Sequence, residues 1–130
     1  MRICPVCDTE MAVLELHGVE IDYCFSCGGI WLDSGELEEL IGNEEESLKI
    51  MKSFKDVTLT NKEKKRPCPI CGKAMKKVEV PLSESPVILD KCPKEHGIWF
   101  DKDELLRIVN SSSDSADQKV VEFLKDMFQE

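Results

Sequence analysis

The sequence predicts a small, metal-stabilised α+β fold that consists of two tandem copies of one unit. The chain has 130 residues, enough for one modest domain or two very small ones. Its seven cysteines fall mostly into Cys-x-x-Cys pairs, which in a reducing compartment are typical of metal or redox sites. The second half of the chain also repeats the first. Because a unit of this size buries too little surface to be stable alone, the prediction includes bound metal.

The internal repeat is clearest around the cysteines. CPVC at 4–7 returns as CPIC at 68–71, and DYCFSCGGIWLD at 22–33 returns as DKCPKEHGIWFD at 90–101. A fainter match continues into the segments that follow each of these motifs. The repeat predicts a first domain at 1–57, a linker at 58–67 and a second domain at 68–130.

Each unit is expected to begin with a β-hairpin and to continue into a helix. Residues 12–16 and 19–23 alternate like strands around His17-Gly18, which suits a tight turn. We therefore interpret His17 as a turn residue and not as a ligand. Asp33 with Glu36, and Asp101 with Glu104, are capping-box pairs that predict the start of a short helix in each unit.

A second amphipathic helix is expected near the end of each unit. Its apolar stripe is predicted at Ile50, Met51, Phe54 and Val57 in the first unit, and at Val120, Val121, Leu124, Met127 and Phe128 in the second. We expect each stripe to pack on its own hairpin, with self-association or partner binding as the alternative. Trp31 and Trp99 are expected to pack the hairpin against the helix.

The cysteines and one histidine make two complete sets of metal ligands. The sets are Cys4, Cys7, Cys24 and Cys27 in the first unit and Cys68, Cys71, Cys92 and His96 in the second. His96 takes the place equivalent to Cys27, so no cysteine is left over. Two close pairs on separate turns suit the closed tetrahedral coordination of structural zinc. We expect two structural zinc ions per chain, with iron as an alternative in the all-cysteine set.

The ligand turns need a permissive backbone directly after the second ligand. Gly28, Gly72 and Gly97 provide it in three of the pairs, and Asp8 is a tolerable substitute in the fourth. Proline after the first cysteine of three pairs presets φ where the turn begins. These local features agree with metal-binding turns.

With these features, the sequence resembles two copies of a prokaryotic zinc-ribbon family, named for its similarity to the zinc finger of transcription factor IIB. The resemblance rests on CPVC at 4–7, CFSCGGIWLD at 24–33 and GEL at 35–37, and it covers residues 4–41 and 68–109. It implies zinc binding and, in each unit, a zinc ribbon, which is a β-hairpin with two zinc knuckles. It connects the chain with transcription through the family's name alone.

The net charge of −9 at pH 7 is unevenly distributed. Residues 62–80 carry +5, between acidic stretches at 1–61 and 81–130. This positive patch is the candidate nucleic-acid-binding surface, with a solvated charged surface as the alternative. The acidic first unit suits a basic protein surface better. The positive patch consists of Lys62, Lys64, Lys65, Arg66, Lys73, Lys76 and Lys77.

The sequence predicts a zinc-binding, non-enzymatic adaptor that interacts with a protein, or with nucleic acid through the second unit. No apolar run is long enough to span a membrane, and the first cysteine lies where a signal peptide needs an apolar stretch. We therefore expect a cytoplasmic protein. No catalytic triad, phosphate loop or carboxylate pair can be assembled. The alternative is a thiol-disulfide oxidoreductase that uses the Cys-Pro-x-Cys pairs.

Overall fold

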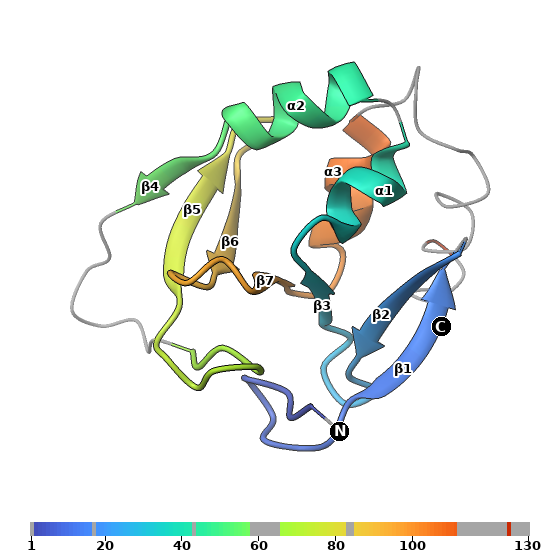
Figure 1. The fold of residues 1–130 in the computed structure, drawn as a ribbon, viewed down its shortest axis with the longest axis vertical. Coiled ribbons are helices and arrows are strands. Elements are labelled where there is room, and N and C mark those ends of the chain that lie inside the picture. The colour runs from blue at the N-terminus through green and yellow to red at the C-terminus, as the bar shows by residue number, and fades with distance from the viewer. Residues whose placement is uncertain are drawn as a thin grey trace.

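The computed structural model describes residues 2–16, 18–42, 44–57, 66–82, 85–111 and 125. The predicted hairpin of the first unit has the predicted bounds, and a third strand and a helix follow it as in the second unit (Figure 1). The first half consists of β1 (Ala12–Leu16), β2 (Val19–Tyr23), β3 (Ile30–Asp33), α1 (Glu36–Ile41), α2 (Glu44–Lys52) and β4 (Lys55–Val57). The second half consists of β5 (Lys76–Val80), β6 (Val87–Lys91), β7 (Gly97–Phe100) and α3 (Glu104–Ser111).

The described strands form one antiparallel sheet in the order β1-β2-β3-β7-β6-β5-β4. The two repeats meet where β3 pairs with β7, and Trp31 lies opposite Trp99. On either side of this pair, Ile30 lies opposite Phe100 and Leu32 opposite Ile98. Equivalent residues of the two repeats thus face each other in reverse order. A pseudo-twofold axis therefore passes through the tryptophan pair.

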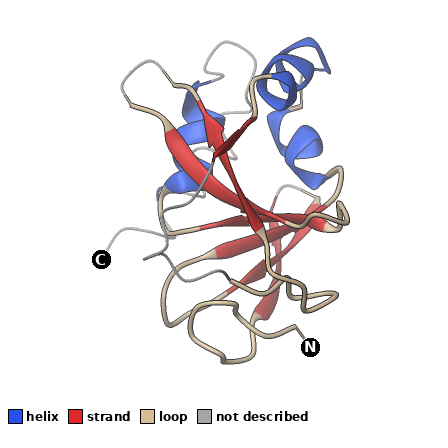
Figure 2. Cartoon of the chain, turned by 90° about the vertical axis from the view of Figure 1, so that its left-hand side faces the viewer, coloured by secondary structure: helices blue, strands red, loops and turns tan. Residues whose placement is uncertain are grey.

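The two faces of the sheet carry different clusters. Because side chains alternate along a strand, Ile30 and Leu32 point to one face while Trp31 points to the other. The helices cover the first face, and the ligand loops lie on the opposite side (Figures 1 and 2). Buried residues of α1, α3 and the strands of both repeats form a single apolar cluster. The two repeats thus share one sheet and one core.

The apolar stripe of the first unit does not lie on a single helix, which corrects the sequence-based expectation. Helix α2 ends at Lys52, and Lys55–Val57 form β4, which pairs with β5 of the second repeat. Phe54 still packs against the shared core, where the Lys91 ammonium lies 5.8 Å from its ring centre. The unpaired edge of β5 offers backbone hydrogen bonds that outweigh continuation of the helix. The second stripe, at 120–128, lies outside the described residues.

Helices α1 and α3 begin at the glutamates of the predicted capping boxes, but Asp33 is not the N-cap of α1. Glu36 Oε1 accepts the Asp33 amide at 2.6 Å, and Glu104 Oε1 accepts the Asp101 amide at 2.8 Å. The N-cap of α1 is Gly35, with φ of 92° and no side-chain hydrogen bond. The capping box is therefore only half formed, which leaves the aspartate carboxylates for other partners.

Candidate metal centres

The eight predicted ligands come together in two groups of four. In each group the ligand atoms all lie within 4.8 Å of one another. One pair of ligands comes from the turn before a hairpin, and the other comes from the turn between the hairpin's second strand and the next strand. Pairing of the hairpin strands, with the short bridges Ile3 to Glu10 and Pro67 to Ala74, brings the two turns together.

The distances between ligand atoms fit tetrahedral zinc. A zinc ion with Zn–S bonds of about 2.3 Å separates its sulfurs by about 3.8 Å. The Cys4 and Cys27 sulfurs are 3.8 Å apart, and those of Cys71 and Cys92 are 3.7 Å apart. His96 presents Nδ1 at 3.5 Å from the Cys92 sulfur. The donor sets and their spacing therefore match what zinc requires.

Backbone amides favour the ionised form of the first sulfur in several of these turns. The amides of Val6 and Cys7 lie 3.4 and 3.3 Å from the Cys4 sulfur. In the second repeat, the Ile70 amide is 3.4 Å from the Cys68 sulfur. The Lys94 amide is 3.3 Å from the Cys92 sulfur. Hydrogen bonds of this kind favour a thiolate, which is the form that binds metal.

The buried thiols of each group need a nearby cation if all of them are to ionise. Burial raises the pKa of Cys4 and Cys27 to about 11, and that of Cys68 likewise to about 11. At Cys24, burial acts in the same direction, but amide donors from Cys27 and Ser26 outweigh it and lower the pKa to about 6. The protein alone thus ionises some thiols of a group readily and others poorly. A bound divalent cation supplies the charge that lets all of them ionise.

Positive φ follows the second ligand at three of the four predicted positions. Asp8, Gly28 and Gly72 have φ of 62°, 79° and 76°. The prediction is wrong for Gly97, because the longer loop to His96 uses Glu95, with φ of 62°, instead. Gly97 has a different role, which is to allow close approach of β3. A Cβ on Gly97 would lie 2.2 Å from the Leu32 carbonyl oxygen.

The two tryptophans lie between the two ligand groups and do not face the helices as expected. Trp31 and Trp99 are fully buried in one cluster with cysteines of both groups, Met11 and Met75. Each indole covers a glycine of the other repeat. A Cβ on Gly29 would lie 2.1 Å from Trp99 Cζ2, and one on Gly97 would lie 2.7 Å from Trp31 Cζ2. The pair therefore links the two metal centres across the pseudo-twofold axis.

An arginine-aspartate-tryptophan network supports the first centre and recurs at the second. The Arg2 guanidinium donates to Asp22 at 2.9 Å and to Asp33 at 2.5 Å, and the Trp31 indole N–H donates to Asp33 at 2.9 Å. The equivalent bonds join Arg66 to Asp90 and Asp101, and Trp99 to Asp101. Sequence reasoning missed this network. The available signal was that each arginine lies two residues before the first cysteine of its repeat.

The described part of the positive patch is partly neutralised within the protein. Lys77 forms an ion pair with the nearly buried Asp90, and Arg66 contacts Asp90 and Asp101. Lys76 lies 3.6 Å from Asp56, and Lys73 is exposed. Lys62, Lys64 and Lys65 lie outside the described residues. Arg66 and Lys77 therefore serve the fold in addition to any role at the surface.

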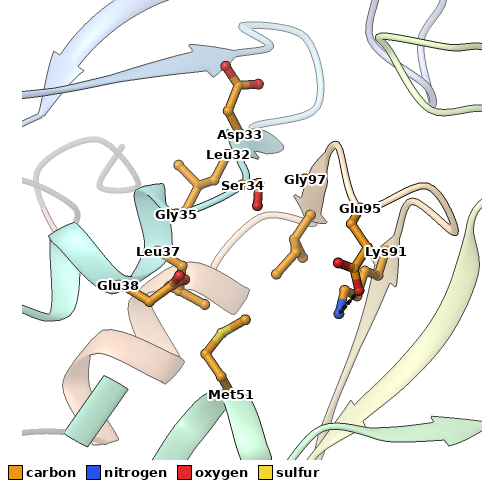
Figure 3. Close-up of a pocket in the computed structure, with 11 residues that line it drawn as sticks. Leu32, Asp33, Ser34, Gly35, Leu37, Glu38, Met51, Lys91, Glu95 and Gly97 are labelled. Atoms are coloured by element: carbon orange, nitrogen blue, oxygen red, sulfur yellow. Dashed lines mark ion pairs between the residues drawn. The ribbon is translucent and has the colours of Figure 1, made fainter. Parts of the chain in front are cut away.

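A pocket of about 180 Å³ lies between the two repeats (Figure 3). Leu37 and Met51 line one side, and the ion pair between Lys91 and Glu95, with 4.0 Å between its charged atoms, lines the other. None of the described residues that line it is a histidine or a cysteine. The pocket therefore offers neither a Ser-His nor a Cys-His pair for catalysis.

Two turns that each supply two ligands, set around a hairpin and a third strand, define a zinc ribbon, and this chain contains two in tandem. The chain belongs to the transcription factor zinc-finger family, which matches residues 3–42 and 67–111. All eight ligands lie within these segments. No curated protein and no solved structure gave a significant match. In the described parts of the chain, no helix is long and apolar enough to cross a membrane.

Proposed function

We propose that the protein is a non-enzymatic, cytoplasmic adaptor that holds two structural zinc ions per chain and acts by binding a partner protein. The observation that carries the proposal is the closed character of both donor sets. Each has four nitrogen or sulfur ligands, which fill a tetrahedral zinc ion and leave no position for a substrate or a reactive water. Zinc in such a site stabilises the fold, and function then depends on the surface.

The thiols of the Cys-Pro-x-Cys pairs do not have the environment of redox nucleophiles. The attacking thiol of a redox pair is exposed and has a lowered pKa. Cys4 and Cys68 are only 1% and 2% exposed, and burial raises the pKa of each to about 11. These observations favour a structural role over the oxidoreductase alternative.

A protein partner is better supported than nucleic acid. Arg66 and Lys77 of the positive patch already pair with aspartates, which reduces the charge available to phosphate. Exposed apolar side chains lie within the ligand turns, with Phe25 74% exposed and Val6 and Ile70 nearly half exposed. Such side chains are common contacts in protein interfaces. Membership of the transcription factor zinc-finger family supports a transcription-related partner.

Metal content and thiol reactivity test the structural role of the zinc. Protein purified without chelator should contain two zinc ions per chain, and no thiol should react under native conditions. Addition of a strong chelator should expose all seven cysteines together with loss of the fold. A readily oxidised cysteine pair in the zinc-loaded protein would instead support the oxidoreductase.

A pull-down with the zinc-loaded protein, at low and moderate salt, tests the adaptor role. Proteins and nucleic acids should both be identified, and we expect a defined protein partner at moderate salt. The Lys73→Gln/Lys76→Gln variant is a suitable probe of the positive patch, because these side chains are more exposed than those of Arg66 and Lys77. Nucleic acid that is retained by the wild type at moderate salt and lost by this variant would contradict the preference for a protein partner.

A further inference from the structure

The sheet face that carries the tryptophans differs between the two hairpins at two positions, and the first is that of Lys77 and Val13. In the second repeat, Lys77 on β5 lies opposite Asp90 on β6, and its ammonium contacts this buried carboxylate. In the first repeat, Val13 on β1 lies opposite Asp22 on β2, the equivalent aspartate. Among the described residues, Asp22 therefore has Arg2 as its cation and lacks the second cation that Asp90 receives.

A groove lies where the lysine is missing. It has a volume of about 380 Å³ and is lined by Arg2, Val13, Glu20, Ile21, Asp22, Asp33 and Glu36. Val13 is 58% exposed, so its short side chain leaves the groove open to solvent. The carboxylates come from β2, β3 and α1, which the shared core holds in place.

Like charges also face each other across the strand pair beside the groove. Glu20 lies directly opposite Glu15 across the β1–β2 pair, and like charges in this position are unfavourable. In the second repeat, the corresponding pair is Glu79 and Ile88, which has a single charge. Among the described residues, no ion pair involves Glu15 or Glu20. A cation that enters the groove from outside would relieve this repulsion.

We propose that this groove binds the side-chain ammonium of a lysine from a partner protein, in the place that Lys77 occupies in the second repeat. The inference rests on the proposed adaptor function and names the chemistry of the partner. The second repeat supplies the evidence for the occupant, because there an arginine and a lysine share the equivalent aspartate. Val13 offers an apolar wall for the methylene stem of the incoming lysine.

A lysine fits this groove better than a metal ion does. Arg2 already donates to Asp22 Oδ2 and to Asp33 Oδ1, so these oxygens are shared with a guanidinium. A divalent cation needs several carboxylate oxygens without a cation between them. An ammonium needs only a single carboxylate oxygen for an ion pair, as Lys77 forms with Asp90 Oδ1.

Nuclear magnetic resonance titration of the zinc-loaded full chain tests the proposal. The probe is an acetylated and amidated peptide with a single lysine between glycines and serines, and the matched control peptide carries acetyl-lysine in its place. We expect the lysine peptide to shift the amide signals of Val13, Glu20 and Asp22, with weaker binding at higher salt. Equal binding of both peptides, or shifts confined to other parts of the chain, would overturn the proposal.

A variant that carries its own lysine provides the sharper test. Val13→Lys supplies the ammonium from within the chain and should weaken peptide binding about fivefold or more, the ratio for an ion pair worth roughly 1 kcal/mol. Val13→Met, similar in length but uncharged, is the matched control and should keep most of the binding. Both should fold, because Val13 is exposed. Unchanged binding in Val13→Lys, or an equal loss in Val13→Met, would contradict recognition by charge.

Failure of the groove proposal can be separated from failure of the adaptor proposal. If the wild type and Val13→Lys retain the same partner in a pull-down, the groove proposal is wrong and the adaptor role stands. If the wild type retains no protein at all, the adaptor role is wrong. Partner loss in Val13→Lys, but not in Val13→Met, would support both.

Discussion

The two repeats build the same scaffold but surround it with different charges. Both have the arginine-aspartate-tryptophan network, yet in the described part of the chain Asp90 pairs with an arginine and a lysine while Asp22 pairs with an arginine only. The Asp90 side chain is 2% exposed and the Asp22 side chain 11% exposed. The second repeat thus neutralises its buried carboxylate internally, and the first leaves part of its charge at the surface.

The net charge of the metal centre is also more negative in the first repeat than in the second. Four thiolates on one zinc ion give a net charge of −2, whereas three thiolates and a neutral histidine give −1. The metal centre and the outer face of the first repeat are therefore both more negative than those of the second. The comparison shows that the two repeats share a scaffold but differ in the charges at their metal centres and around their equivalent aspartates.

Removal of one metal tests whether the repeats are energetically independent and should have the largest effect. Structural zinc contributes on the order of 10 kcal/mol to folding. Because β3 and β7 pair within a common core, we expect Cys24→Ser or Cys92→Ser to unfold both repeats. Circular dichroism melts and zinc counting provide the measurement. A variant that keeps one zinc ion and a cooperative melt would show instead that each repeat folds alone.

Alanine at Gly29 or Gly97, the two glycines at the β3–β7 junction, should lower the free energy of unfolding by a smaller amount. At Gly97 the new Cβ would lie 2.2 Å from a backbone oxygen of β3, whereas at Gly29 it would lie 2.1 Å from an indole. An indole can shift more easily than a paired strand, so Gly97→Ala should lose about 3 kcal/mol and Gly29→Ala about 1–2 kcal/mol. Urea unfolding of the zinc-loaded variants measures both values.

Gly72→Ala is the control for these two variants, because Gly72 has positive φ but no atom lies within 4 Å of the position that an added methyl group would take. It should lose only about 1 kcal/mol, from backbone conformation alone. Equal losses in all three variants would mean that close packing at the β3–β7 junction contributes little.

Substitutions at Val13 and Lys77 test the charge difference between the repeats directly. Lys77→Met leaves a carboxylate oxygen of the buried Asp90 without its ammonium and should destabilise the fold by about 2–3 kcal/mol. Val13→Lys should stabilise it by about 0.5–1 kcal/mol, because the new ammonium reaches Asp22. Urea unfolding checks both changes, and Val13→Met serves as the uncharged control. Stabilisation in Val13→Met as well would point to packing as the cause.

Substitution of Glu104 should have an effect on stability that depends on pH. Burial raises the pKa of Glu104 from 4.5 to about 7. The folded state therefore binds this proton more tightly than the unfolded state, and its contribution to stability is lost as pH rises from 4.5 to 7. Glu104→Gln keeps an acceptor for the Asp101 amide and should gain about 1–2 kcal/mol above this range, since solvent partly screens the carboxylate.

The difference in unfolding free energy between wild type and Glu104→Gln, followed across this pH range, measures the effect and cancels the pH dependence of zinc binding. Glu36 is the equivalent residue of the first repeat, and burial raises its pKa as well. A carbon NMR titration of the Glu104 carboxyl with a midpoint near 4.5 would contradict the prediction.

The ligands and hairpin could be predicted because their signals are local. Ligand spacing and the turn at Gly18 involve neighbouring residues only, and the strand bounds followed from them. The pairing of β3 with β7 has no local signal, because each repeat simply presents an unpaired strand. The strand β4 is three residues long, and its partner belongs to the other repeat. No pattern within its own unit could have indicated it.

Two features had signals that the sequence reasoning did not use. Alternation along Ile30, Trp31 and Leu32 already separates the tryptophan from the apolar residues that face the helices. Arg66 was grouped with the positive patch by its charge, although its position relative to Cys68 repeats that of Arg2 relative to Cys4. The position of Arg66 within its repeat was a better guide to its role than its charge.

The twofold pairing of β3 with β7 has a consequence for the origin of the chain. A single repeat would leave β3 as an open edge and expose a tryptophan, so an ancestor with one repeat would have been stabilised as a homodimer. Duplication and end-to-end fusion turn that dimerisation into an intramolecular step. Fusion also allows two formerly identical subunits to evolve separately, and the two repeats now differ at the position of Val13 and Lys77.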